Sequence, residues 1–181
     1  RSGMGRLDVL ERVVDKHGPK SVVLLTADTL VEDEDNWRFA RQVHSRLKCR
    51  WTILADGRTP MEVGRDERCV PNNRLAVCSR VLKRELLRTH IDATYDPTDS
   101  VIYLGFDWTE DHRLAAAVPH WAPWTIAAPL AEPPYLAKPQ IEALFADRGI
   151  ALPLLYAQGF SHANCGGACV RAGQAQWAHT L

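Results

Sequence analysis

The sequence lacks long apolar runs and any excess of charge of one sign. No run approaches the roughly 20 apolar residues that span a bilayer, and no basic segment followed by an apolar one marks a secretory signal. We therefore expect a cytoplasmic protein with no membrane partner. Lys and Arg number 22, as do Asp and Glu, which argues against a general polyanion binder but leaves a local basic patch open.

The sequence has neither the cysteine framework of a secreted domain nor the common phosphate-binding signatures. Five cysteines are an odd number and do not resemble the disulfide framework of a secreted domain, so we expect reduced thiols. The chain has neither the Gly-Lys-Ser/Thr of a Walker loop nor a G-x-G-x-x-G fingerprint. Its glycine-containing opening is therefore neither a Walker P-loop nor a dinucleotide-binding turn.

The residues that are present suffice for one folded domain. The length is typical of a single domain, and 46% hydrophobic residues supply a core. We expect residues 1–181 to form one α/β domain. Within it, the proline-rich stretch 118–139 is predicted as loop, and the rest of 118–181 as a cysteine-containing helical extension.

Short apolar runs alternate with segments of helical periodicity. The expected fold class is therefore α/β, a mostly parallel, Rossmann-like sheet with helices on both faces. The run 21–27 is typical of a strand buried on both faces. Because the chain opens on a glycine turn with no strand before it, we expect the first strand of the sheet to be missing. The predicted strands are 21–27, 50–55 and 100–106, and the predicted helices are 6–17, 34–47, 80–91 (N-cap Ser79), 109–117 (N-cap Thr109), 139–148 and 168–180, with a short helix opening at Thr59-Pro60.

The end of the first predicted strand is a candidate ligand site, because parallel sheets bind ligands beyond the carboxyl ends of their strands. Ala27, Asp28 and Thr29 occupy that position. An acid there can bind a ribose hydroxyl, an adenine amine or Mg²⁺. The acidic run 32–35 that follows indicates a solvated helix start that complements the helix dipole.

Two other connections are candidates for the same edge of the sheet. Ser2, Gly3 and Gly5 precede a helix, so they form either a phosphate cradle of backbone N–H groups or an ordinary turn. Gly105 follows the last strand and permits close approach of a ligand. Glu110 and Arg113 lie one helical turn apart and are either part of the site or a structural pair.

A basic helix begins near Cys78. Arg80, Lys83 and Arg84 share one face by i, i+3, i+4 spacing, and that face either neutralises phosphates or is merely solvated. Cys78 lies near the helix N-terminus, where a thiolate is favoured.

The segment 159–174 contains a second group of cysteines. Cys165 and Cys169 are four residues apart and are flanked by His162 and two glycines, which can place soft ligands around one metal ion. Cys78 would supply a third ligand. The alternative is two small cysteines packed at the start of a helix.

These pieces, in this order, resemble the phosphoadenosine-phosphosulfate (PAPS) reductase-like proteins of bacteria and phages, within the adenine-nucleotide alpha-hydrolase-like, or PP-loop, superfamily. The segments that resemble the family extend over nearly the whole chain, and the last two are the most specific. They are RSGMGR (1–6), LLTADT (24–29), CSRVLKREL (78–86), YLGFDWTEDHR (103–113) and GFSHANCGGACVRAGQAQW (159–177).

The resemblance implies an ATP or PAPS site. The family's S-G-G-x-D-S loop would place phosphates on Ser2, Gly3 and Gly5, although Arg1 and Arg6 stand where the motif has serines. Adenosine would lie near Ala27, Asp28 and Thr29. The basic residues Arg80, Lys83 and Arg113 would lie near the phosphates.

The resemblance also implies a reaction. Members cleave ATP, with Mg²⁺, between the alpha and beta phosphates and adenylate an acceptor that is then attacked, often by sulfur. Some thiolating relatives bind an iron–sulfur cluster through three cysteines, a part that Cys78, Cys165 and Cys169 would play; Zn²⁺ is the other metal considered. The chain has no E-C-G-L-H segment, so PAPS reductase activity itself is not expected.

Two other interpretations stay open. One is a relative that binds nucleotide, or none, and has lost catalysis, as the changes at Arg1 and Arg6 allow. The other is a metal-stapled module that binds nucleic acid through its six Trp residues and the basic helix.

Overall fold

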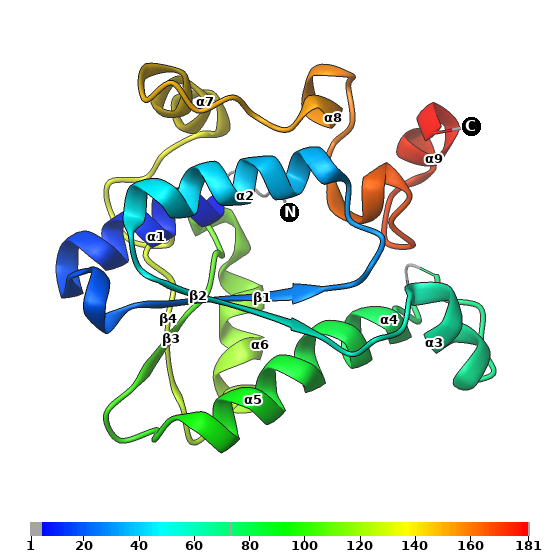
Figure 1. The fold of residues 1–181 in the computed structure, drawn as a ribbon, viewed down its shortest axis with the longest axis horizontal. Coiled ribbons are helices and arrows are strands. Elements are labelled where there is room, and N and C mark those ends of the chain that lie inside the picture. Colours follow the sequence, from blue (N-terminus) through cyan, green and yellow to red (C-terminus); the bar gives the residue numbers. More distant parts are fainter. Residues whose placement is uncertain (1–4, 73, 181) are drawn as a thin grey trace.

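The computed structural model describes residues 5–72 and 74–180. Helices dominate, and short parallel strand pairs lie between them (Figure 1). The elements in chain order are α1 (Gly5–His17), η1 (Pro19–Ser21), β1 (Val23–Asp28), α2 (Glu34–Leu47), β2 (Arg50–Ala55), α3 (Pro60–Asp66), α4 (Val77–Ser79), the π-helical segment η2 (Arg80–Glu85), α5 (Leu86–Thr94), β3 (Val101–Tyr103), η3 (Trp108–Glu110), α6 (Asp111–Trp121), β4 (Thr125–Ala127), α7 (Lys138–Asp147), α8 (Leu154–Ala157), η4 (Asn164–Gly167) and α9 (Gln174–Thr180).

The strands form two parallel pairs. β1 pairs with β2 from Val23↔Arg50 to Asp28↔Ala55, and β3 pairs with β4 over three residues. A bridge between Asp107 and Leu130 continues the second pair. The predicted α/β class with parallel strands is confirmed. The strands of the described residues lie in two separate two-stranded sheets, and every residue of β1 is half-buried instead of fully buried.

Local capping explains where α2 begins and ends and where α3 begins. The Asp33 side chain accepts a hydrogen bond from the N–H of Asp35 at 2.8 Å, and Lys48 ends α2 in the left-handed conformation. Thr59 and Glu62 form a capping box at α3, with Pro60 at the first helical position. The predicted helix 34–47 and the short helix at Thr59-Pro60 are therefore confirmed.

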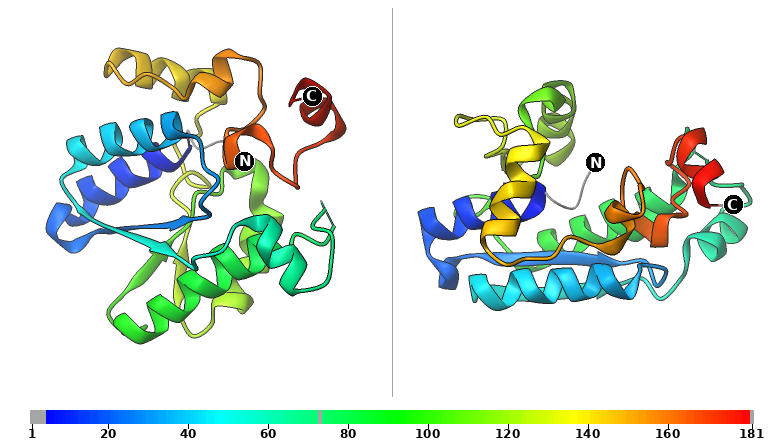
Figure 2. Two further views of the ribbon diagram at one scale, coloured as in Figure 1. Left: turned by 45° about the vertical axis from the view of Figure 1, so that its right-hand side comes forward. Right: turned by 90° about the horizontal axis from the view of Figure 1, so that it is seen from above.

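Helices cover both faces of the β1–β2 pair. On one face α1, α2 and α7 enclose the main core, in which the rings of Phe39 and Phe145 lie 5.7 Å apart. On the other face η2 and α5 contact the strands, and the left view of Figure 2 shows this layering. A second core under α3 and α4 contains Val63 and Leu82, both fully buried. Burial of one such side chain contributes roughly 1.5–3 kcal/mol.

The helix that bears Cys78 differs from the prediction. It begins at Val77 instead of Arg80, and Ser79 lies inside it without a side-chain capping bond. Helical structure continues through the π-helical segment to Thr94. Ser79 as the N-cap was therefore wrong.

The region after residue 100 differs more. The predicted strand 100–106 shortens to Val101–Tyr103, and Asp107 instead of Thr109 caps the next helical turn, accepting the N–H of Thr109 at 2.8 Å. The predicted loop 118–139 contains the end of α6 and the strand β4. In place of a helix over 168–180, η4 and α9 are separated by an irregular stretch.

Within the part of the chain that the structure describes, no helix has the length and apolarity needed to cross a bilayer.

Candidate functional site

A tight turn, stabilised by a hydrogen bond to Asp28, follows the carboxyl end of β1. The Asp28 carboxylate accepts the N–H of Leu30 at 2.8 Å, and Leu30 adopts a left-handed conformation. Thr29 is almost completely buried at 2% exposure. Asp28 therefore stabilises the β1–α2 turn, while the backbone of Ala27 and Asp28 ends the strand where a ligand of a parallel sheet would lie.

Glu32 joins this turn to two distant segments. Its Oε1 accepts hydrogen bonds from Lys83 Nζ at 3.3 Å and from the Thr29 hydroxyl at 3.4 Å. Its Oε2 accepts the backbone N–H of Cys165 at 2.9 Å and the Asn36 amide at 3.5 Å. Only 14% of the Glu32 side chain is exposed. The sequence placed Glu32 in a solvated acidic run; the structure shows that it binds η2 and the cysteine segment to the end of β1.

Further hydrogen bonds join the segment 151–163 to side chains of α2. The Asn36 amide donates to the carbonyl of Ala163 at 2.5 Å, and the Asp35 carboxylate accepts the N–H of Leu154 at 2.7 Å. Arg38 donates to the carbonyl of Ala151 at 3.0 Å and pairs with Asp35. Figures 1 and 2 show the orange segment beside the β1–α2 turn in agreement with these contacts.

Cys165 and Cys169 contact each other in a tight turn. Cys165 has a φ of 53°, and Gly166 and Gly167 follow with φ of 59° and 88°. A Cβ at Gly167 would lie 2.6 Å from the Phe160 ring, so glycine is required there. The two thiols interact, with Cys165 as the donor and Cys169 as the acceptor.

The surroundings shift the pKa values of the two thiols in opposite directions. The hydrogen bond from Cys165 lowers the pKa of Cys169, and the backbone N–H of Arg171 with the positive charge of His162 and Lys83 lowers it further against the effect of burial. The same hydrogen bond, together with burial, raises the pKa of Cys165. Cys169 is therefore the thiolate of the pair and Cys165 the neutral donor.

Cys78 behaves differently from the prediction. It is 8% exposed and belongs to the core under α3 and α4. Burial raises the pKa of its thiol, which outweighs any effect of the helix N-terminus. It nevertheless lies within electrostatic reach of Cys169, so the structure brings together all three cysteines that the sequence nominated.

The contacts of these cysteines show whether their side chains could bind a metal ion. Across residues 5–72 and 74–180, no group of three or more His, Cys, Asp or Glu side chains is arranged to hold a metal ion. The free thiols of Cys165 and Cys169 interact with each other, and Cys78 is packed in a core. As they stand, the side chains do not fit Zn²⁺ or an iron–sulfur cluster. We derive no chemical step through such a group.

The basic residues of the helix go to different partners. Lys83 pairs with Glu32 at the site. Arg80 pairs with Glu67 and with Glu85, each at 2.8 Å, on the exposed side of the helix. The i, i+5 pairing of Arg80 with Glu85 lies across the π-helical segment. Lys83 is therefore the cation of this helix that the structure joins to the end of β1.

The connection after β3 contains its own ion pair. Arg113 pairs with Glu110, and its guanidinium lies 4.4 Å from the centre of the Phe106 ring. Gly105 is exposed beside them. The structural pair that the sequence allowed is confirmed, and the described contacts of Glu110 and Arg113 stay within the β3–α6 connection. The predicted phosphate turn falls largely outside the described residues: this holds for Ser2 and Gly3, while Gly5 is the first residue of α1.

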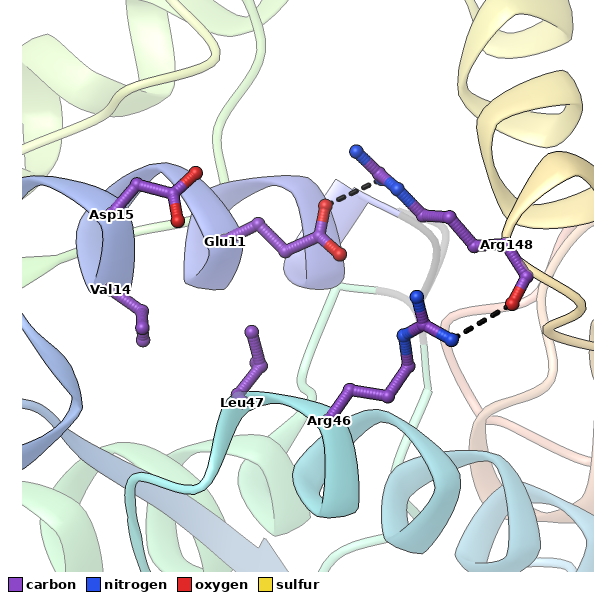
Figure 3. A pocket seen from close by; sticks show the side chains of 6 residues that line it. All are labelled: Glu11, Val14, Asp15, Arg46, Leu47 and Arg148. Carbon is purple, nitrogen blue, oxygen red and sulfur yellow. Dashed lines mark hydrogen bonds and ion pairs between the residues drawn. The ribbon is translucent and has the colours of Figure 1, made fainter.

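The hollow drawn in Figure 3 is not at this site. It has a volume of about 460 Å³ and lies between α1 and the end of α2, where Glu11 pairs with Arg148 at 2.5 Å and Arg46 donates to the carbonyl of Arg148. Burial raises the pKa of Glu11, opposed by the charge of Arg148. Because Leu47 at the end of α2 leads into β2, this hollow is at the amino end of the strands.

Comparison with protein-family models, curated proteins and solved structures finds no significant match for this chain.

Proposed function

We propose that the chain is an adenine-nucleotide-binding protein of the PAPS reductase-like, Rossmann-like type, with ATP or PAPS as its ligand. We propose further that it cleaves ATP between the alpha and beta phosphates, adenylates an acceptor and thereby prepares it for sulfur transfer. One observation supports this best. The Glu32 contacts bring Lys83 and the Cys165–Cys169 pair to the carboxyl end of β1, where parallel sheets bind nucleotides.

The proposal gives each element a physical role. The backbone at Ala27 and Asp28 would contact the adenosine, because the Asp28 side chain is already bonded to its own turn. Lys83 would neutralise phosphate oxygens, which compete with Glu32 for its ammonium group. Arg80 and Arg113 would contribute only if their present ion pairs open.

The reaction then needs positioning and charge more than acid–base chemistry. A nucleophilic atom of the acceptor attacks the alpha phosphorus, the bond from that phosphorus to the bridging oxygen breaks, and pyrophosphate leaves with its electron pair. Mg²⁺ would arrive with the nucleotide, because Asp28 and Glu32 already accept hydrogen bonds from protein groups. Lys83 stabilises the negative charge that gathers on the phosphates.

Nucleotide binding is tested by thermal unfolding and calorimetry with ATP, PAPS and AMP. We expect ATP or PAPS to stabilise the chain and AMP to do so less, because AMP lacks the outer phosphates. Lys83→Met should weaken ATP binding about tenfold, or by about 1.4 kcal/mol. The matched control is Lys20→Met, an exposed lysine beside the amino end of β1. No stabilisation by any of the three ligands would contradict the proposal.

Catalysis is tested separately by pyrophosphate release. Binding without release in any acceptor mixture would identify a relative that binds nucleotide but has lost the reaction. Anaerobic purification with iron, zinc and sulfide analysis tests whether the cysteines acquire a metal when it is supplied.

A further inference from the structure

Cys165 and Cys169 are placed against each other and not against the core. The side chains of Cys165 and Cys169 interact across one turn, and both residues are half-buried. Cys49 and Cys78, by contrast, are buried at 3% and 8% exposure. Two cysteines four residues apart in one turn can reach the roughly 2.05 Å of an S–S bond when the turn between them adjusts.

The turn between the two cysteines can adjust to that approach. Three residues separate them, and two of these, Gly166 and Gly167, already have positive φ, where glycine moves without strain. The segment is held from outside by the Cys165 N–H on Glu32 and by the Asn36 amide on Ala163. The sulfurs are therefore kept close by a short, adaptable connection that is anchored at its edge.

The surroundings favour thiol–disulfide exchange at Cys169. Lys83 and His162 lie within electrostatic reach of its sulfur, the N–H of Arg171 bonds to it, and the pKa of Cys169 is lowered accordingly. A thiolate that is partly exposed in positive surroundings is the reactive form in such exchange. Cys165, kept protonated as the donor, is the partner that reacts second.

We propose that Cys165 and Cys169 form a redox-active dithiol that closes reversibly to a disulfide, with a low-molecular-weight disulfide of the glutathione class as oxidant. The inference does not depend on the proposed nucleotide site.

The reaction balances in two exchanges. The Cys169 thiolate attacks one sulfur of the oxidant, forms a mixed disulfide and expels one thiolate. Cys165 then attacks the Cys169 sulfur, and the S–S bond of the mixed disulfide breaks to release the second oxidant half, while the Cys165 proton passes to a departing thiolate. The protein pair is oxidised by two electrons, and the oxidant disulfide is reduced to one thiol and one thiolate.

Peptide mapping tests this on the whole chain. Trypsin leaves both cysteines in one peptide, 149–171, while Cys78 lies in 75–80 and Cys69 in 69–74. The reduced protein, treated with a chelator, is exposed to increasing oxidised glutathione, acid-quenched, alkylated and digested. We expect peptide 149–171 to have no alkyl group and to weigh two hydrogen atoms less than the reduced, unalkylated peptide, and to regain both alkylation sites after dithiothreitol. Peptide 69–74 should stay alkylated.

Variants make the result specific. Cys165→Ser should stop at a mixed disulfide of glutathione on Cys169, and the matched Cys69→Ser should oxidise like the original chain. Circular dichroism checks that each variant is folded. Persistent double alkylation of peptide 149–171 at oxidant levels that oxidise a thioredoxin-like control would overturn the proposal. So would a cross-link between 149–171 and 75–80, which would make Cys78 the partner of Cys169.

Discussion

Glu32 accepts the backbone N–H of Cys165 at 2.9 Å and thereby joins two residues that are 133 positions apart. The same carboxylate pairs with Lys83. The end of β1, the π-helical segment and the cysteine turn therefore share one acceptor.

Glu32→Gln should destabilise the chain by about 1–3 kcal/mol, because it removes the charge that accepts from Lys83 and turns one acceptor oxygen into a donor. Chemical denaturation followed by tryptophan fluorescence measures the change. Glu34→Gln is the control, because the Glu34 side chain is 81% exposed. Equal stabilities of the two variants would show that the Glu32 contacts do not stabilise the fold.

Gly167→Ala should disturb the cysteine turn, while Gly173→Ala should not. A Cβ at Gly167 would meet the Phe160 ring at 2.6 Å with φ at 88°, whereas a Cβ at Gly173 has no atom within 4 Å. We expect a loss of about 1–3 kcal/mol for the first variant and little change for the second. Denaturation and the alkylation rate of Cys169 are the two measurements. If Gly167→Ala matches the original chain in both, the described turn is incorrect.

Leu82→Ala should cost about 2–5 kcal/mol, because Leu82 is fully buried in the core beneath Cys78. Leu75→Ala removes the same atoms from a leucine that is 61% exposed and should stay within about 0.5 kcal/mol of the original chain. The comparison is made by urea denaturation at one pH. A small loss at Leu82 would mean that α3 and α4 do not enclose a core.

The lowered pKa of Asp35 predicts that the stability of the chain depends on pH. The hydrogen bonds from Arg38 and, opposed by burial, from the N–H of Leu154 hold the pKa of Asp35 below its usual 3.8. A carboxyl group whose pKa is lowered by folding stabilises the native state above pH 3.8, and this contribution is lost as the pH falls through the folded-state pKa.

The gap in unfolding free energy between the original chain and Asp35→Asn should therefore be largest near neutral pH and shrink below about pH 3.8. Denaturation series between pH 7 and pH 2.5 measure it. Glu34→Gln provides the comparison, since an exposed carboxylate should give a small gap at every pH. A gap for Asp35→Asn that widens in acid would reverse the assigned direction of the pKa.

Local patterns predicted the first part of the fold well. Helix α2 and strand β2 have the predicted bounds, and α3 begins at Thr59-Pro60 as predicted. Short stretches of sequence suffice for this, because they contain the apolar spacing and the capping residues Asp33 and Thr59. β4 was missed, since three residues between Pro123 and Pro129 give no period to detect. A strand of that length is specified by its partner β3 and not by its own composition.

Some members of the candidate site could be predicted from the sequence, but the contacts that connect them could not. The sequence nominated Lys83 and the three cysteines, and the structure brings them together. Glu32 was overlooked because its neighbours Asp33 and Glu34 do begin a helix, so the whole acidic run looked solvated, although the Glu32 side chain is only 14% exposed. The thiolate expected at Cys78 failed for the same reason: burial depends on residues far away in the chain.

The bond between Glu32 and Cys165 also leads to an expectation about folding. Because contacts so far apart in sequence must overcome the entropy of closing a long loop, we expect this bond to form late. The arrangement of the Cys165 and Cys169 sulfurs depends on that last contact. We therefore expect the reactivity of Cys169 during refolding to report when the segment around Cys165 has docked on the β1–α2 turn.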